Sequence, residues 1–266
     1  MNQALHLPSG KFQFKSVIAI LFIGLFTITD IHAQLLNVER IRSDADTVGW
    51  HGDIGFDFSV NRLNDRVIRL RNSANTSYNS LNHTYLLLTS LELVNVDGTS
   101  LVSSGYFHLR SQFVRDRTLS PEFFLQYQYN ANLGLDNRSL AGGGIRYNFL
   151  QRERLTGSLF SGVMFEHEVW SLAGDESVTN NFLKSTSNIG LTGYINPQTR
   201  LILIGYYQAR PDRFFESRAT LESQLNVRIS RFVSIAVSFT MTYDTDPVID
   251  IPELTYVLQN GLLINF

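Results

Sequence analysis

Alternation of apolar and polar residues at the end of the chain constrains the fold more than any other sequence feature. In residues 254–266 every second residue, counted from 254, is apolar, except for Asn260. These apolar residues are Leu254, Tyr256, Leu258, Leu262, Ile264 and Phe266. Successive side chains of a β-strand point to opposite faces, so this period of two predicts a strand between two different surroundings.

The same segment resembles the C-terminal assembly signal of bacterial outer-membrane β-barrels, in which a polar residue, a glycine, a hydrophobic residue and a terminal aromatic residue recur at fixed spacing. The matching residues are Gln259, Gly261, Ile264 and Phe266. The resemblance implies that the barrel assembly machinery binds this strand. The alternative is an ordinary edge strand that happens to end in phenylalanine.

The N-terminus has the pattern of a secretory signal peptide. Lys11 and Lys15 precede an apolar stretch at 17–28, and Ile31-His32-Ala33 is a suitable cleavage site. The apolar stretch is shorter than the roughly 18–20 residues that a membrane-spanning helix needs, which disfavours an uncleaved anchor. We therefore predict a signal peptide at 1–33, a periplasmic lead-in at 34–49 and a folded part at 50–266.

Composition excludes several classes of protein. The formal net charge of −2 argues against electrostatic binding of nucleic acid. The chain has no cysteine, so an exported protein of this sequence has no disulfide framework and needs an extensive hydrogen-bonded sheet or core. After the predicted signal peptide, the longest notable apolar run, 201–207, is too short to cross a bilayer as a helix.

Alternating segments recur along the whole folded part and predict twelve strands. Most of these segments are longer than the strands of soluble sheets, as expected for tilted strands that cross a hydrocarbon layer. They lie at 50–60, 67–76, 83–94, 104–114, 122–133, 140–150, 155–169, 182–195, 200–209, 217–229, 232–243 and 253–266.

The predicted architecture is an up-and-down antiparallel transmembrane β-barrel with both termini periplasmic. Short connections at 151–154, 196–199 and 230–231 alternate with longer ones at 171–181, 210–216 and 244–252, as in outer-membrane barrels. The connections 72–82 and 115–121 are too long for this scheme, and segments 83–94 and 200–209 are apolar on both parities. A soluble β-sandwich that binds sugars or proteins has the same periodicity, but with its apolar faces turned inward.

Several motifs resemble the salt-induced outer-membrane protein family, catalogued as domain of unknown function 481. They are GWHGDIGFDFSV from Gly49, AGGGIRYNF at 141–149, LTGSLFSGVMFEHE at 155–168, YDTDP at 243–247 and the terminal strand. The resemblance covers most of residues 49–266. It implies a bacterial outer-membrane barrel without an established biochemical role.

The alternate strand residues whose side chains are expected to point into the barrel include charges of both signs. The expected lumen residues are Asp53, Asp57, Arg69, Arg71, Arg110, Arg146, Glu166, Glu168, Lys184, Arg218, Glu222 and Arg228. A loop centred near Glu176 would place Glu168 opposite Lys184 and Glu166 opposite Thr186. Such a network either fills and stiffens a narrow barrel, which we favour, or forms a selectivity ring.

No residue is predicted to be catalytic, to bind a cofactor or to hold a metal. Outer-membrane hydrolases use histidine with serine, asparagine or aspartate, so the candidates are His51, His83, His108 and His167, but no flanking motif supports them. A calcium site formed by Asp244, Asp246 and Asp250 is disfavoured, because acids in a flexible loop are usually solvated. The sequence therefore predicts a barrel surrounded by outer-membrane lipid, with a structural role or a minor pore for small polar solutes or ions.

Overall fold

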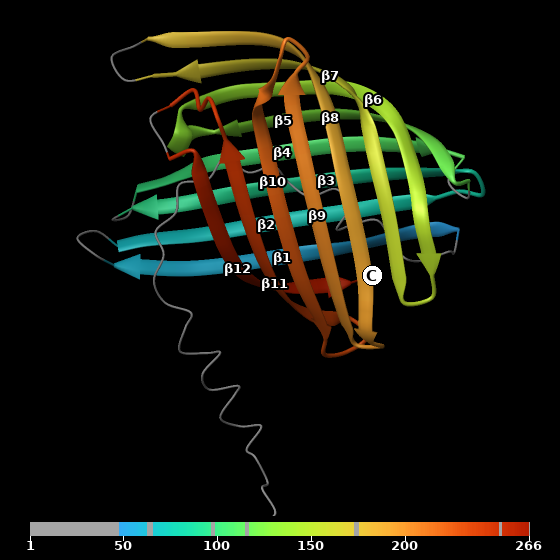
Figure 1. Cartoon of the computed structure of the whole chain (residues 1–266). Coiled ribbons are helices and arrows are strands. Elements are labelled where there is room, and N and C mark those ends of the chain that lie inside the picture. The colour runs from blue at the N-terminus through green and yellow to red at the C-terminus, as the bar shows by residue number, and fades with distance from the viewer. Residues whose placement is uncertain are drawn as a thin grey trace, which may run out of the picture. The chain divides into compact units, whose positions relative to one another are not determined.

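The computed structural model describes residues 48–62, 66–96, 99–114, 117–172, 176–249 and 252–265, and Figure 1 shows them as a sheet of long strands. The predicted signal peptide and all but the last two residues of the lead-in lie outside these ranges, and so does Phe266. Among the described residues, no helix is both long and apolar enough to cross a membrane.

The described part of the chain forms twelve strands, which confirms the predicted number. They are β1 (Gly49–Arg62), β2 (Arg66–Asn79), β3 (His83–Val96), β4 (Thr99–Phe113), β5 (Leu119–Asn130), β6 (Leu135–Arg152), β7 (Leu155–Ser171), β8 (Ser177–Asn196), β9 (Thr199–Arg210), β10 (Arg213–Arg228), β11 (Val233–Asp244) and β12 (Leu254–Asn265). A 3-10 turn at Ala131–Leu133 lies between β5 and β6.

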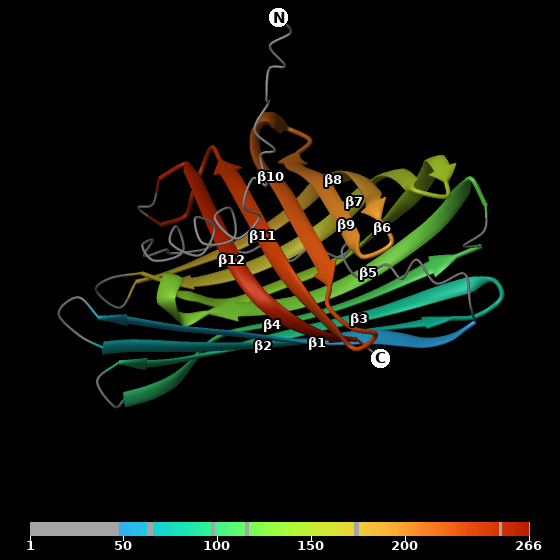
Figure 2. The ribbon, with the colours of Figure 1, turned by 90° about the horizontal axis from the view of Figure 1, so that it is seen from below.

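The strands form one closed antiparallel barrel in which every strand pairs with its neighbours in sequence. Closure joins β1 to β12, as predicted, and residues Asp53–Phe56 pair with 262–265. This seam is short, since β1 pairs with β2 from Gly49 to Arg62. Beyond the seam β1 and β12 diverge, which Figures 1 and 2 both show. We call the end that holds Gly49 and Asn265 the terminal rim, and the opposite end the distal rim.

The direction of the apolar face distinguishes a membrane barrel from a soluble sandwich. On β5 the outward side chains of Phe123 and Leu125 are 58% and 54% exposed, whereas inward Glu122 is fully buried. The same arrangement recurs on most of the strands, so large apolar side chains cover the outside and polar ones line the inside. A soluble protein rarely exposes so wide an apolar surface, and this arrangement is that of a barrel surrounded by lipid.

Both strands of ambiguous facing have apolar side chains in the lumen. Leu86 and Leu88 on β3 point inward and are buried, while Leu87 points outward. On β9, Ile202 and Ile204 are buried and Leu203 faces outward. These two inward clusters explain why neither segment shows clear alternation in the sequence.

Several connections are shorter than predicted, although the one between β10 and β11 is longer, at 229–232 rather than 230–231. Strand β2 continues to Asn79, so the predicted connection 72–82 is only 80–82, and the doubtful connection 115–121 is 114–118. At the distal rim β9 and β10 are joined by residues 211–212, although we expected a loop over 210–216. Strand ends that leave the membrane are solvated on both faces, so they show no apolar alternation and read as loops in the sequence.

Glycines on β6 and β7 allow two backbones and two aromatic rings to approach closely. A Cβ atom on Gly144 would lie 2.3 Å from the Ser161 carbonyl oxygen, and one on Gly162 would lie 2.2 Å from that of Gly143. The ring of Phe124 fills the space over Gly142 inside the barrel, and Phe123 covers Gly143 outside. Side chains larger than glycine would therefore push β5, β6 and β7 apart.

Candidate functional site: a charged network in the lumen

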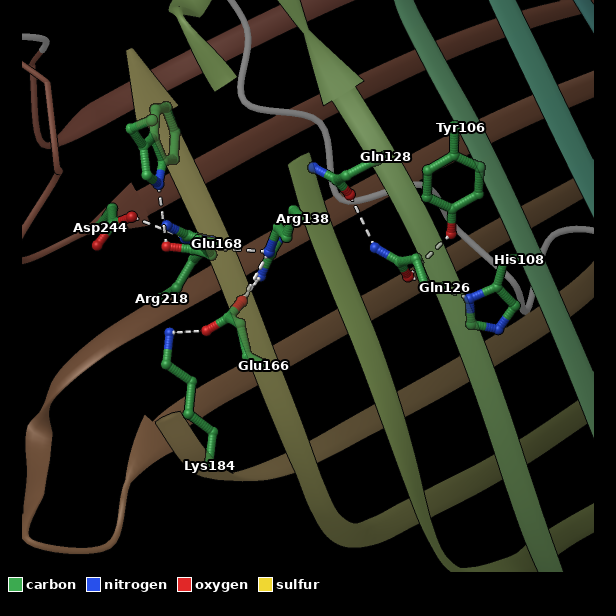
Figure 3. A network of polar contacts seen from close by, with 11 residues as sticks. Tyr106, His108, Gln126, Gln128, Arg138, Glu166, Glu168, Lys184, Arg218 and Asp244 are labelled. Atoms are coloured by element: carbon green, nitrogen blue, oxygen red, sulfur yellow. Dashed lines mark hydrogen bonds and ion pairs between the residues drawn. The ribbon is translucent and has the colours of Figure 1, made fainter. Parts of the chain in front are cut away.

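Alternate residues of β6, β7 and β8 bring a group of charged side chains together near the distal rim. Glu166 and Glu168 of β7 point inward and are at most 1% exposed. The Arg138 Nε atom of β6 donates to Glu166 Oε1 at 2.6 Å and lies 3.1 Å from Glu168 Oε1. Lys184 Nζ of β8 forms an ion pair with Glu166 Oε2 (Figure 3). Arg138 thus contacts both carboxylates, and Lys184 contacts that of Glu166.

The same network crosses the lumen. Arg218 Nη1 of β10 lies 3.8 Å from Glu168 Oε1 of β7, although β8 and β9 separate these strands in the sheet. Arg218 Nε also donates to Asp244 Oδ2 of β11 at 2.7 Å. Figure 3 shows these groups converging from different parts of the wall. Contact between strands that are not neighbours narrows the lumen at this level.

Charges within this distal network balance. Three carboxylates, Glu166, Glu168 and Asp244, face three cations, Arg138, Lys184 and Arg218. The Trp170 indole Nε1 adds a neutral hydrogen bond to Glu168 Oε2 at 3.1 Å. Buried charges of one sign remain ionised only when opposite charges and hydrogen bonds compensate for lost hydration, and this composition meets that condition.

A second charged cluster lies nearer the terminal rim. Arg110 Nη1 of β4 donates to Glu122 Oε2 of β5 at 3.1 Å, and Arg146 Nη1 of β6 lies 3.7 Å from Glu122 Oε1. The Arg110 guanidinium also packs over the rings of Phe124 and Phe160, 5.2 and 5.4 Å from their centroids. Cation–π contact and the shared carboxylate fix Arg110 against the wall rather than across the lumen.

Neutral polar groups connect the two clusters along β4 and β5. The Tyr106 hydroxyl donates to Gln126 Oε1 at 3.2 Å, and His108 Nδ1 lies 3.1 Å from the same oxygen. Gln126 Nε2 then donates to Gln128 Oε1 at 2.8 Å (Figure 3). Because a carboxamide oxygen only accepts hydrogen bonds, His108 donates from Nδ1. This ladder gives the wall a neutral polar lining between charged levels.

The remaining predicted lumen residues occupy different surroundings. Asp53 Oδ2 accepts a hydrogen bond from Asn75 at 2.8 Å, and Arg71 Nε donates to Glu92 Oε2 at 3.0 Å. Glu222 is buried inside β10. Asp57, which lies beside Gly261, and Arg69 are also half-buried. Arg228 is exposed at the terminal end of β10. The structure therefore does not gather all twelve residues into one site.

The predicted pairing of β7 with β8 is wrong by four residues. Lys184 lies opposite Met164, Glu166 opposite Phe182 and Glu168 opposite Asn180. The hairpin is centred near residue 174 rather than Glu176, because β7 continues to Ser171 and β8 begins at Ser177. Lys184 reaches Glu166 diagonally along the same face, so the ion pair involves a different glutamate from the expected one.

Four charged residues of these networks were not among the predicted lumen residues. Glu122 shares the parity of Gln126 on β5, so the alternation itself could have identified it. Arg138 and Asp244 lie in strand ends that were taken for connections, and Glu92 lies on the ambiguous segment 83–94. The alternation near these strand ends is too weak to place the boundaries of β6 and β11 from the sequence.

Other candidate groups are dispersed. Among the described residues no group of histidine and acidic side chains could hold a metal ion. In the disfavoured calcium site, Asp244 instead accepts hydrogen bonds from Arg218 and from the Asp246 backbone N–H, while Asp250 lies outside the described residues. His108 points into the lumen, and His167 points outward on β7. In the assembly signal, Gln259, Gly261 and Ile264 belong to β12, and Phe266 is outside the described part.

Comparison of the sequence with protein families gives one match that covers most of the chain. Residues 55–266 match the family described as "Protein of unknown function, DUF481". The chain belongs to the DUF481 family. No curated protein matches this DUF481 member.

Several solved structures that resemble this DUF481 barrel are described as outer-membrane channels or porins, and others are translocator domains of autotransporters. A channel from Pseudomonas putida F1 is 9% identical, with a TM-score of 0.51 over 84% of this chain and 97% of that one. The NanC porin (8% identity, TM-score 0.47, 82% and 98% coverage) and the KdgM porin (11%, 0.43, 81% and 99%) are also similar. At these identities the likeness concerns the fold, which is that of an outer-membrane β-barrel.

Proposed function

We propose that this DUF481 protein is a narrow channel of the bacterial outer membrane that passes small polar solutes or ions. The observation that carries the proposal is the polarity of the barrel, which has apolar side chains outside and charged ones inside, the reverse of a soluble protein. A polar lumen in a membrane barrel is typical of channels. The distal network, which joins β7 to β10 across the lumen, restricts passage to small species.

The distal network suits a filter for ions of both signs. Its carboxylates and cations alternate around the constriction, so a hydrated ion of either charge finds partners there. Neutralising one member unbalances the filter. Glu168→Gln leaves excess positive charge and should favour anions, whereas Lys184→Met leaves excess negative charge and should favour cations.

Planar-bilayer recording of the purified barrel tests this function directly. We expect discrete conductance steps from the wild type and opposite shifts of the reversal potential from Glu168→Gln and Lys184→Met. Glu216→Gln is the matched control, because Glu216 forms an exposed pair with Arg213 outside the lumen. A wild type without conductance would contradict the channel and favour a purely structural role, in which the same ion pairs fill and stiffen the barrel.

We also propose that both termini face the periplasm and that the assembly machinery inserts the barrel through β12. Support comes from the even number of strands and the resemblance of 259–266 to the assembly signal. An epitope inserted at 211–212 should be accessible on whole cells, and one placed after Gln34 should not.

A further inference from the structure

Three polar side chains form a row on the outer face of β6, β7 and β8, outside the lumen. Ser139 of β6 lies opposite His167 of β7, and His167 lies opposite Asn181 of β8. Opposite residues of antiparallel strands have Cβ atoms about 4.5–5.5 Å apart on one face, so the three side chains are direct neighbours. Sequence positions 139, 167 and 181 gave no sign of this row, because only the strand register creates it.

The hydrogen bond between His167 and Asn181 fixes the tautomer of the imidazole. His167 Nδ1 lies 2.9 Å from Asn181 Oδ1. A carboxamide oxygen only accepts, so Nδ1 carries the proton and Nε2 presents its lone pair. The histidine is therefore oriented as a general base by a third residue, which is the relationship that catalytic triads require.

Ser139 supplies a hydroxyl on the other side of the histidine. Its Oγ donates to Asn137 Oδ1 at 3.0 Å, and both side chains are half-buried on the outer face. Rotation about the Cα–Cβ bond redirects the hydroxyl towards the neighbouring imidazole. The Asn137 side-chain N–H, on the same outer face of β6, would then serve as an oxyanion donor to the carbonyl oxygen of the ester.

The row lies where the apolar belt of this wall ends. On β7 the large exposed apolar side chains run from Leu155 to Phe165, and beyond His167 only the partly buried Val169 continues the outward apolar series. Ten residue steps of strand measure about 33 Å, or about 25 Å across the membrane at a tilt of roughly 40°, the usual height of the apolar band. Ser161, a polar residue within this belt, accepts a hydrogen bond from Ser187. Ser139, His167 and Asn181 are thus at the level of the lipid ester bonds.

An apolar groove begins next to the row, on the side of the terminal rim. The next outward residues towards the terminal rim are Ala141, Phe165 and Leu183, which are register partners and all line a groove of about 640 Å³. Small side chains on β6 leave the groove open between ridges formed by Phe123 and Leu125 of β5 and by Val163 and Phe165 of β7. Its volume is in the range of ligand sites, and its opening faces the hydrocarbon layer.

We propose that Ser139, His167 and Asn181 are the catalytic residues of a hydrolase that cleaves acyl esters of membrane lipids, with the groove holding the acyl chain. Ser139 Oγ attacks the ester carbonyl carbon while its proton passes to His167 Nε2. The tetrahedral intermediate expels the lipid alcohol, which takes that proton, and leaves an acyl-serine. Water then attacks the acyl-serine, gives a proton to Nε2 and releases the fatty acid as Ser139 regains its proton.

Fatty-acid release by the purified full-length barrel in mixed micelles tests the proposal. One arm supplies dipalmitoyl phosphatidylcholine and the other lipid A, which distinguishes a phospholipid from a glycolipid as the source of the ester. We expect Ser139→Ala and His167→Ala to lower release by at least about 10³-fold, because members of a triad act as a unit. Asn181→Ala should lower it less, and Ser161→Ala, an outward serine outside the groove, should leave it unchanged.

A second measurement separates catalysis from folding. A serine-reactive phosphonate with a long alkyl chain should label the Ser139 peptide of the wild type, as mass spectrometry would show. It should not label His167→Ala, even though that variant still shifts on gels after boiling as a folded barrel does. Ala141→Phe, which fills the groove, should raise KM for long-chain lipid but not for a short-chain ester.

Three results would overturn the proposal: no release in either arm, release that persists in Ser139→Ala, or labelling that maps to a different serine. None of them bears on the channel, because the row and the lumen network face opposite sides of the wall. Conductance without hydrolysis would leave the proposed channel intact, and hydrolysis without conductance would leave the proposed hydrolase intact.

Discussion

The inner and outer faces of the wall formed by β6, β7 and β8 differ in chemistry although their residues alternate along the same strands. Arg138 and Glu166 belong to a buried ion-pair network inside the barrel. Ser139 and His167, each the next residue in the chain, lie outside at the edge of the apolar belt. The difference shows that a β-strand in a barrel wall can present two unrelated sets of side chains, one for each parity.

The surroundings of the two faces explain the difference in composition. Inside, charges face one another and neutralise in pairs, because carboxylates and cations from several strands converge in a narrow space. Outside, only uncharged polar side chains occupy the row at the lipid boundary, where a charge would lose hydration without gaining a partner. Changes on one face should therefore leave the function of the other intact.

The most direct test of the independence of the two faces is to substitute two neighbouring residues of β7, one at a time. His167→Ala should lower hydrolysis by at least about 10³-fold and leave conductance unchanged. Glu166→Gln should shift ion selectivity towards anions and leave fatty-acid release unchanged. Measuring both activities on both variants decides the matter, and a variant that loses both activities while folded would show that the faces are coupled.

Removing the central cation of the inner face should be the most destabilising single change. Arg138→Met leaves the buried carboxylates of Glu166 and Glu168 facing each other, and breaking a buried pair costs about 3–5 kcal/mol. Arg138→Lys keeps the charge but lacks the planar guanidinium, so this variant should lose less stability than Arg138→Met. Urea unfolding in detergent micelles measures both values; equal stability of Arg138→Met and wild type would mean that water in the lumen replaces the pair.

The loss of stability caused by a charge on the outer face should depend on the depth of that charge in the membrane. Ile189 lies in the middle of the outward apolar belt of β8, between Leu183 and Ile195. Ile189→Arg should cost about 2–4 kcal/mol if it is near the midplane, and Ile195→Arg, near the terminal rim, at most about 1 kcal/mol. Folding titrations into lipid vesicles provide the test, which fails if the two positions respond alike.

The smallest effect is expected where both faces leave the membrane. Arg213 and Glu216 form an ion pair at the distal start of β10, and each side chain is about half exposed. Water screens such a pair, so Arg213→Ala should leave unfolding indistinguishable from wild type. A clear loss of stability would indicate that the distal strand ends are packed against another part of the protein.

Sequence alternation predicted the strand number, the antiparallel order and the closure of β12 onto β1, because lipid and lumen impose opposite polarity on every strand. It failed where that contrast is absent. Leu86 and Leu88 fill the lumen, so β3 is apolar on both faces, and the solvated ends of β7 and β8 were read as a loop. The latter error shifted the hairpin and gave Lys184 the wrong partner.

Inward parity placed Glu166, Glu168, Lys184 and Arg218 in the lumen, but it could not tell which charges meet. Arg218 contacts Glu168 although two strands separate them, since the curvature of the barrel brings distant strands together across the lumen. The row of Ser139, His167 and Asn181 needed the register of two strand pairs, and a slip of one residue turns each side chain to the other face.

On the strands with clear alternation, the sequence by itself determined which residues share a face, because that choice depends only on the local period of two. The tertiary structure alone decided which residues are neighbours, because neighbours are set by register and curvature. Ion pairs in the lumen and the row on the outer surface both depend on contacts between strands, and the free energy that selects those contacts belongs to the closed barrel rather than to any single strand.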